Sequence, residues 1–201
     1  MLHLGNLGFG HRTDTIADVA LELTGENVTF LFVGGGVRYP ELAKEAERRR
    51  LDDVRFRDYV PRDETPRVLA GADCTFISLD DRSLGIMSPC KLNGSLAMGV
   101  PVVYAGPVGT NVDEAISTYG CGFSLRQGDI DGLVGAVRRL RDDPALAAEM
   151  SRNARRAFEE DHSDDRALPR FDALLDEVAG RRTGRASTSP VDPAARTREA
   201  S

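Results

Sequence analysis

The residues from Leu84 to Val103 read LGIMSPCKLNGSLAMGVPVV and predict a helix that leads directly into a buried strand. Ser88 is a suitable N-cap for this helix, and Pro89 suits its first position, where a missing N–H costs nothing. Gly99 favours the left-handed conformation that often ends a helix. Lys91 falls in the first turn, where a cation opposes the helix dipole by about 0.3–1 kcal/mol. Because a bound anion would reverse that penalty, we interpret Lys91 as part of a phosphate site, with a solvated lysine as the alternative.

Strands and helices alternate along most of the chain. Residues 28–33 form a continuous apolar run that ends in three glycines, which is typical of a strand buried on both faces. Further strands are expected at 2–5, 54–57, 73–79, 101–104 and 123–125, and helices at about 16–23, 40–50, 62–71, 111–119, 129–140 and 143–154. The pattern predicts an α/β fold with a doubly wound, Rossmann-like parallel sheet and helices on both faces.

The composition changes at Gly180. A last helix is expected up to about Ala179, with Pro169 as a kink or as its true start. Beyond it, arginine, serine, threonine, proline and alanine replace the apolar periodicity. We therefore expect one domain over 1–179 and a disordered tail over 180–201.

Composition argues against several classes of protein. The chain has 201 residues and a net charge of −6, which does not favour a nucleic-acid partner. The three cysteines, Cys74, Cys90 and Cys121, lack the spacing of a disulfide framework or a zinc site, and the three histidines form no metal motif. The sequence shows no run of about 18 apolar residues and no recognisable signal peptide. These features predict a cytoplasmic protein without a metal, a cofactor or an integral membrane segment.

Three loops are expected at one edge of the sheet, because right-handed crossovers gather the carboxyl ends of parallel strands there. They cover 8–12, 34–38 and 79–88. A nicotinamide site would need Gly-x-Gly-x-x-Gly, but Tyr39 stands at the third glycine position after 34–36. Neither a P-loop motif nor a serine–histidine–aspartate set with a nucleophile elbow occurs. The topology thus brings Lys91 near the first glycine loop.

Four segments resemble family 4 glycosyltransferases. They are Gly5-Asn6-Leu7-Gly8, FLFVGGG at 30–36, VRF with YVP at 54–61, and Pro-x-Lys-Leu-x-Gly-x-Leu-Ala-x-Gly-x-Pro-Val at 89–102. The resemblance covers roughly 1–178 and is to the carboxy-terminal, donor-binding domain of a GT-B-fold enzyme. It implies that a nucleotide-sugar binds in a cleft between two Rossmann-like domains and that a sugar is transferred to an acceptor with retention.

The resemblance also implies a donor site. Gly8, Phe9 and Gly10 would approach the diphosphate, with His11 or Arg12 as a phosphate-binding cation. Tyr59 and Val60 would border the nucleobase. The full expected set, with no catalytic group assigned, is Gly8, Phe9, Gly10, His11, Arg12, Gly34, Gly35, Tyr59, Val60, Met87, Ser88, Lys91 and Leu92. Simpler readings are a tight turn for the glycines, a solvated Arg12 and a packing role for Tyr59.

The sequence departs from the family in two respects. Many relatives carry two glutamates eight positions apart, where this chain has Ile86 and Gly94. The family also has a second, acceptor-binding domain, so we expect this chain to hold a donor but to transfer poorly by itself. The alternatives are a non-catalytic nucleotide-sugar-binding subunit and a truncated product. Expected partners are the donor, a separate acceptor domain, or a second copy that covers the apolar residues of the last helix, which are Leu168, Phe171, Leu174, Leu175 and Val178.

Overall fold

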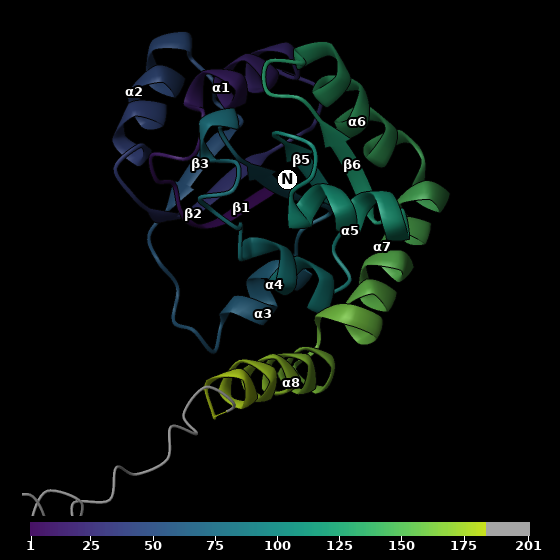
Figure 1. The fold of residues 1–201 in the computed structure, drawn as a ribbon. Coiled ribbons are helices and arrows are strands. Elements are labelled where there is room, and N and C mark those ends of the chain that lie inside the picture. The colour runs from purple at the N-terminus through teal and green to yellow at the C-terminus, as the bar shows by residue number, and fades with distance from the viewer. Residues whose placement is uncertain (184–201) are drawn as a thin grey trace, which may run out of the picture. The chain divides into compact units, whose positions relative to one another are not determined.

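The computed structural model describes residues 1–183, and in it six parallel strands form one sheet (Figure 1). The strand order is β3-β2-β1-β4-β5-β6, so the chain starts in the middle of the sheet. It adds β2 and β3 on one side of β1 and then crosses to the other side for β4, β5 and β6. The strands are β1 (Leu2–Asn6), β2 (Phe30–Gly35), β3 (Val54–Arg57), β4 (Thr75–Ser78), β5 (Val102–Ala105) and β6 (Gly122–Leu125). This order confirms the predicted doubly wound, Rossmann-like sheet.

Helices cover both faces of this sheet. They are α1 (Thr13–Glu22), α2 (Tyr39–Arg49), α3 (Thr65–Ala70), α4 (Lys91–Ala97), α5 (Asn111–Tyr119), α6 (Ile130–Asp142) and α7 (Pro144–Ala157), with short helical segments η1 (Asp81–Ser83) and η2 (Phe158–His162). Side chains of α1, α2 and α6 share one apolar cluster, and those of α4 and α5 share another. Neighbouring strand residues alternate between these clusters, as Phe76 and Ile77 do, because successive side chains of a strand point to opposite faces.

The start of α4 differs from the prediction. The helix begins at Lys91 with Cys90 before it, and no side chain caps it. Ser88 is exposed in a loop, while Pro89 is buried, so neither residue occupies the helical position predicted for it. Residues 87–89 lie outside the helix, and Lys91 is its first residue. Gly99 does adopt the predicted left-handed conformation, with φ of 63°.

Two other helices also begin without a side-chain cap. Thr13 begins α1 and caps nothing, because its hydroxyl donates to Glu41 instead. The predicted helix over 62–71 is shorter in the structure, because α3 begins at Thr65 and has Pro66 in its first turn. Proline is tolerated there, since the first N–H groups of a helix have no intrahelical acceptor.

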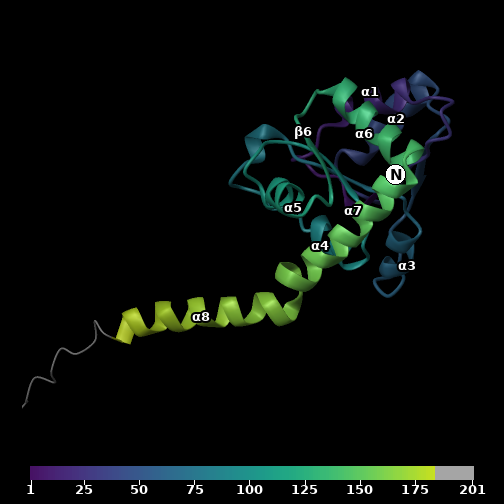
Figure 2. The same cartoon turned by 90° about the vertical axis from the view of Figure 1, so that its right-hand side faces the viewer.

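The described chain separates into two compact units, the first ending at Ser163 and the second beginning at Asp164. The second unit contains α8 (Asp164–Thr183), a single helix of 20 residues (Figure 2). Pro169 lies inside α8 and does not mark its start. The helix continues past Gly180, and the remainder of the predicted tail, 184–201, lies outside the described residues.

Candidate functional site

Backbone hydrogen bonds join the loops at the carboxyl ends of the strands. The amide of Leu7 donates to the carbonyl of Gly35 at 2.7 Å, and the amide of Arg38 donates to the carbonyl of Leu7 at 3.0 Å. On the other side, the amide of Asp80 donates to the carbonyl of Gly10 at 2.7 Å. The loop over 8–12 therefore lies between the loops that follow β2 and β4, as the sequence predicted.

Lys91 reaches across this edge to the end of the central strand. Its Nζ donates to the backbone carbonyl of Asn6 at 3.0 Å. Its aliphatic stem passes β1, because a Cβ added at Gly5 would lie 3.6 Å from Lys91 Cε. Among residues 1–180, no carboxylate forms an ion pair with Lys91. Partial burial lowers the pKa of the ammonium, which is the expected effect of an environment that lacks a counter-ion.

Two histidines lie beneath this lysine. His3 and His11 are 2% and 4% exposed, and their rings meet edge to face with centroids 5.4 Å apart. Burial first, and then the charge of Lys91, lower the pKa of His3 to about 3 and that of His11 to about 4. Burial therefore favours the neutral form of both rings at pH 7 in the chain without a ligand, and of His11 and Arg12 only Arg12 carries a charge there.

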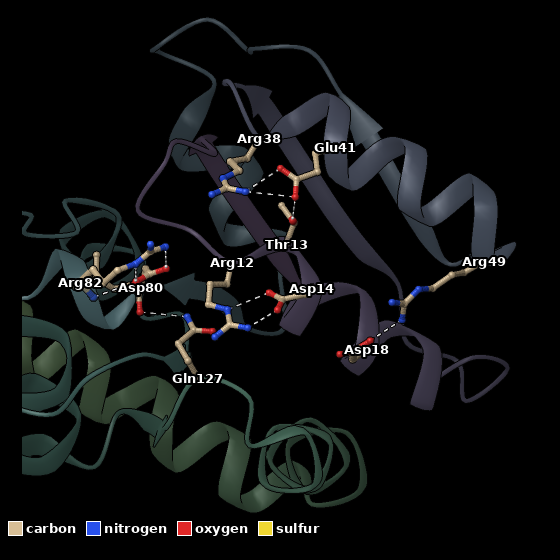
Figure 3. A network of polar contacts seen from close by, with 11 residues as sticks. Arg12, Thr13, Asp14, Asp18, Arg38, Glu41, Arg49, Asp80, Arg82 and Gln127 are labelled. Atoms are coloured by element: carbon tan, nitrogen blue, oxygen red, sulfur yellow. Dashed lines mark hydrogen bonds and ion pairs between the residues drawn. The ribbon is translucent and has the colours of Figure 1, made fainter.

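Each of three arginines at this edge already faces a carboxylate. The ion pairs are Arg12 with Asp14, Arg38 with Glu41 and Arg82 with Asp80 (Figure 3). Arg12 Nε donates to Asp14 at 3.1 Å, and a second guanidinium nitrogen contacts the same carboxylate. Arg82 holds the pKa of Asp80 at about 2. An anion that approaches Arg12 must therefore compete with Asp14, whereas Lys91 presents its charge without such a competitor.

A cavity of about 290 Å³ adjoins Lys91. Its walls come from β1, β4, α3 and α4, and its lining residues include Tyr59, Val60, Thr65, Cys90, Lys91 and Gly94. The volume is near the lower end of the roughly 300–1,000 Å³ that is usual for small-molecule sites. The structure thus brings together Tyr59, Val60 and Lys91, three residues that the sequence assigned to one site.

The glycines at this edge of the sheet differ in what a side chain at their position would contact. A Cβ at Gly10 would lie 2.6 Å from Met87 Sδ, so these two predicted site residues are in direct contact. A Cβ at Gly35 would lie 3.0 Å from the ring of Tyr59. Gly34 has φ of 138°, and its Cβ would lie 2.3 Å from the carbonyl oxygen of Gly5. Gly34 therefore permits the close approach of β1 and β2, which is a structural role.

The remaining predicted residues are divided between surface and core. Phe9, Met87 and Ser88 are exposed, whereas the side chain of Leu92 is fully buried in the cluster formed by α4 and α5. Three further participants were not predicted: the carbonyl of Asn6, the buried His3 and the cavity residue Cys90. Asn6 belongs to the quoted motif Gly5-Asn6-Leu7-Gly8, and Cys90 stands directly before Lys91, but Asn6 contacts Lys91 through its main-chain carbonyl, which no side-chain pattern indicates.

A larger hollow of about 920 Å³ opens at the opposite edge of the sheet, where Met1, Asn27 and Pro101 are among its lining residues. None of the predicted site residues lines it. Within the described part of the chain, no helix has the length and apolar character needed to span a membrane. The same residues include no group of three or more metal-ligating side chains.

Residues 1–143 match the family of group 1 glycosyl transferases. The chain belongs to this family. The match confirms the resemblance to the carboxy-terminal domain of GT-B enzymes.

Individual proteins show the same relationship. The putative colanic acid biosynthesis glycosyl transferase WcaI of Escherichia coli is 25% identical over 140 residues, which are 69% of this chain and 34% of WcaI. The carboxy-terminal domain of a Francisella tularensis group 1 protein, LpcC, superposes with a TM-score of 0.64 at 15% identity, covering 80% of this chain and 86% of that domain. HepE of Anabaena in complex with UDP-glucose has a TM-score of 0.69 at 17% identity, with 90% of this chain and 48% of HepE covered. This chain thus spans about a third of WcaI and about half of HepE.

Proposed function

We propose that this chain is the donor-binding half of a retaining glycosyltransferase, which transfers a hexosyl or related sugar from a nucleotide-sugar to an acceptor. The nucleobase would enter the cavity beside Tyr59 and Val60. The diphosphate would lie between Lys91 and the loop over 8–12. When the bond between the sugar and the diphosphate breaks, the leaving phosphate takes the electron pair, and the ammonium of Lys91 stabilises the developing negative charge.

The observation that carries this proposal is the electrostatic situation of Lys91. The ammonium is partly buried and forms no ion pair with a carboxylate among residues 1–180, and Lys91 lines the cavity. A buried charge without a partner is costly unless a ligand of opposite sign binds. A phosphate is such a ligand, and the UDP-glucose complex of the similarly folded HepE supports a nucleoside diphosphate in particular.

A second candidate is a nucleotide-sugar-binding subunit or truncated product that lacks activity until a separate acceptor domain joins it. Two positions favour it. Ile86 is 81% exposed, and Gly94 lines the cavity, where many relatives carry glutamates. A longer side chain at Gly94 would also meet Leu69, because even a Cβ would lie 3.2 Å from Leu69 Cδ1. The donor groups that those glutamates would contact therefore need another partner.

Titration calorimetry with UDP, GDP and ADP tests whether the edge binds a nucleoside diphosphate and which base it prefers. We expect one of the three to bind at a single site, and inorganic phosphate to compete weakly. If none binds, the proposal fails. Transfer or hydrolysis of the matching radiolabelled nucleotide-sugar then separates the two candidates. Turnover by this chain alone supports the transferase. Binding without turnover supports the subunit, provided that an added acceptor domain makes turnover possible.

A further inference from the structure

Two buried histidines lie beneath the proposed phosphate site, and the function proposed above does not use them. His3 comes from β1 and His11 from the loop that follows this strand, and their rings are in edge-to-face contact. Burying a polar ring is costly unless its nitrogens find hydrogen-bond partners. The partners of the ring nitrogens therefore determine what this pair can do.

One of these nitrogens has no partner. His3 Nδ1 lies 3.2 Å from the carbonyl oxygen of Phe76. Because a carbonyl can only accept, Nδ1 carries the hydrogen of the neutral ring, and Nε2 is left with a lone pair. In the described part of the chain, this Nε2 is buried without a hydrogen-bond partner. A proton can be added at such a nitrogen if an acceptor for the new N–H lies within reach.

The acceptor near both rings is the carbonyl of Asn6. Burial has the largest effect on the pKa of His3 and of His11 and lowers both, whereas the carbonyl of Asn6 raises them. Lys91 Nζ donates to this same carbonyl at 3.0 Å, and its charge lowers the two pKa values further. Lys91 thus keeps the pair neutral in two ways, because it occupies the acceptor and repels a second cation.

We propose that the pair formed by His3 and His11 takes up one proton from solvent when the diphosphate of a nucleotide-sugar binds to Lys91. This inference rests on the function proposed above, because it needs an anion at Lys91. A phosphate oxygen that accepts from Nζ draws the ammonium away from the carbonyl of Asn6 and offsets its charge. The carbonyl can then accept an N–H of a protonated ring. The pair takes one proton and not two, since two charged rings with centroids 5.4 Å apart would repel each other.

Other groups around the pair are apolar, uncharged or already paired. β2 contributes the ring of Phe32, and β4 contributes the hydroxyl of Ser78, which lies 3.0 Å from His11 Nδ1. The charged side chains of the surrounding loops and helices pair with one another, as Arg12 with Asp14, Arg38 with Glu41 and Arg82 with Asp80 (Figure 3). Arg82 holds the pKa of Asp80 at about 2, so this carboxylate does not titrate near neutral pH. Lys91 is therefore the charge to which the pair responds.

An experiment without ligand tests the link between Lys91 and the pair. NMR can follow the imidazole signals of the three histidines, His3, His11 and His162, as a function of pH. Lys91→Met keeps the length of the side chain but removes its charge and its hydrogen bond to Asn6. The pKa of His3 or of His11 should then rise by roughly one pH unit. Lys44→Met, on α2, is the matched control and should leave all three signals unchanged. If Lys91→Met changes neither titration, the inference is overturned.

Binding of UDP-glucose tests the proton uptake itself. Its diphosphate is substituted at both ends and lacks the ionisation of a phosphate monoester near pH 6, so a proton that is taken up belongs to the protein. With an anion at Lys91, the pKa of the pair should rise to about 6. Calorimetry at about pH 6, in two buffers of different ionisation enthalpy, should then show about half a proton taken up per ligand. The affinity should be about fourfold higher at pH 5.5 than at pH 7.5. GDP-mannose or ADP-glucose replaces UDP-glucose if the chain prefers that base.

Variants assign the proton to the pair. Uptake should be lost in the double variant His3→Phe with His11→Gln and should persist in His162→Gln. NMR of the unmodified chain gives the same answer without a variant, because ligand at about pH 6 should move one of the two imidazole signals toward its protonated position. Uptake confined to pH values above about 7 would belong to the ammonium of Lys91, which is fully charged at pH 6, and would overturn the inference. Binding without uptake also overturns it but leaves the proposed function standing, whereas failure of every nucleotide-sugar and nucleoside diphosphate to bind defeats both.

Discussion

The ammonium of Lys91 donates a hydrogen bond to the backbone carbonyl of Asn6, a residue 85 positions earlier, at 3.0 Å. This contact joins the first residue of α4 to the last residue of β1, which lies at the centre of the six-stranded sheet. It places a cation at the point where the strand order reverses, where open α/β sheets bind their ligands. The sheet topology therefore brings Lys91, at the start of α4, to the end of β1.

We expect Lys91→Ala to weaken the binding of a nucleoside diphosphate by at least about 1 kcal/mol, because a charge-assisted hydrogen bond to phosphate is lost. Lys44 is the only other lysine of the chain, is exposed on α2, and provides the control variant Lys44→Ala. Titration calorimetry measures both. Equal affinity of the Lys91 variant and the unmodified chain would falsify the phosphate role.

Gly10→Val should abolish donor binding while the fold is retained. The new side chain would collide with Met87, whose Sδ would lie 2.6 Å from the Cβ, and a flexible methionine can move without disturbing the core. If displacement of Met87 is the cause, Met87→Ala in the same chain should restore part of the affinity. Calorimetry and thermal unfolding together decide, and a stable Gly10→Val variant that still binds would show that the loop is only a turn.

Gly34→Ala should instead damage the fold. Its φ of 138° is strained for any residue with a Cβ, and that Cβ would lie 2.3 Å from the carbonyl oxygen of Gly5. We expect the free energy of unfolding to fall by about 3 kcal/mol. Gly25→Ala is the control, because Gly25 has φ of 77° but open space around it, and should cost about 1 kcal/mol. Urea unfolding that gives equal losses for both would show that the close approach of β1 and β2 is unimportant.

Acid should destabilise the first unit before its carboxylates titrate. His3 and His11 have pKa values of about 3 and about 4 in the folded chain, below the ordinary value of 6.5. The unfolded chain therefore binds more protons below about pH 6.5, and the free energy of unfolding falls as the pH decreases, by up to about 1.4 kcal/mol per pH unit for each histidine. Above that pH both states are neutral at these rings, so stability levels off.

Urea unfolding between about pH 7.5 and 5.5 measures this slope while the carboxylates remain ionised. His3→Phe removes one of the two groups but keeps an aromatic ring beside Phe32, whose centroid lies 5.5 Å from that of His3. The slope of this variant should be about half that of the unmodified chain. A stability that is constant over this range would mean that the two rings are not neutral and buried.

The sheet could be predicted because local patterns determine it. The apolar run at 28–33 and the glycines that follow indicate a strand buried on both faces, and parallel topology then dictates which loops meet. The start of α4 could not be predicted in this way. Ser88 and Pro89 form a good capping sequence, but the same residues also suit a loop, and the structure places them in one.

The candidate site was predictable to a similar degree. Lys91, Tyr59 and Val60 do line one cavity, because motif residues at strand ends share an edge. The partner of Lys91 is a main-chain carbonyl, and no side chain in the sequence could indicate it. The pairing of Arg12 with Asp14 is different, since a carboxylate two positions away was visible in the sequence.

That pairing leads to the last prediction. Asp14 holds the guanidinium of Arg12, and Arg12 in turn lowers the pKa of this carboxyl, so the two charges largely neutralise each other. Asp14→Asn should free the guanidinium of Arg12 to contact a bound diphosphate and increase the affinity for a nucleoside diphosphate by roughly two- to fivefold, the scale of an exposed ion pair. Asp18→Asn is the matched control, because Asp18 also lies on α1 and forms an ion pair, but with Arg49 of α2. Calorimetry at low and high salt should show the gain for Asp14→Asn shrinking as salt screens the arginine. A loss of affinity in Asp14→Asn, or the same gain in Asp18→Asn, would mean that Asp14 positions Arg12 rather than competing for it.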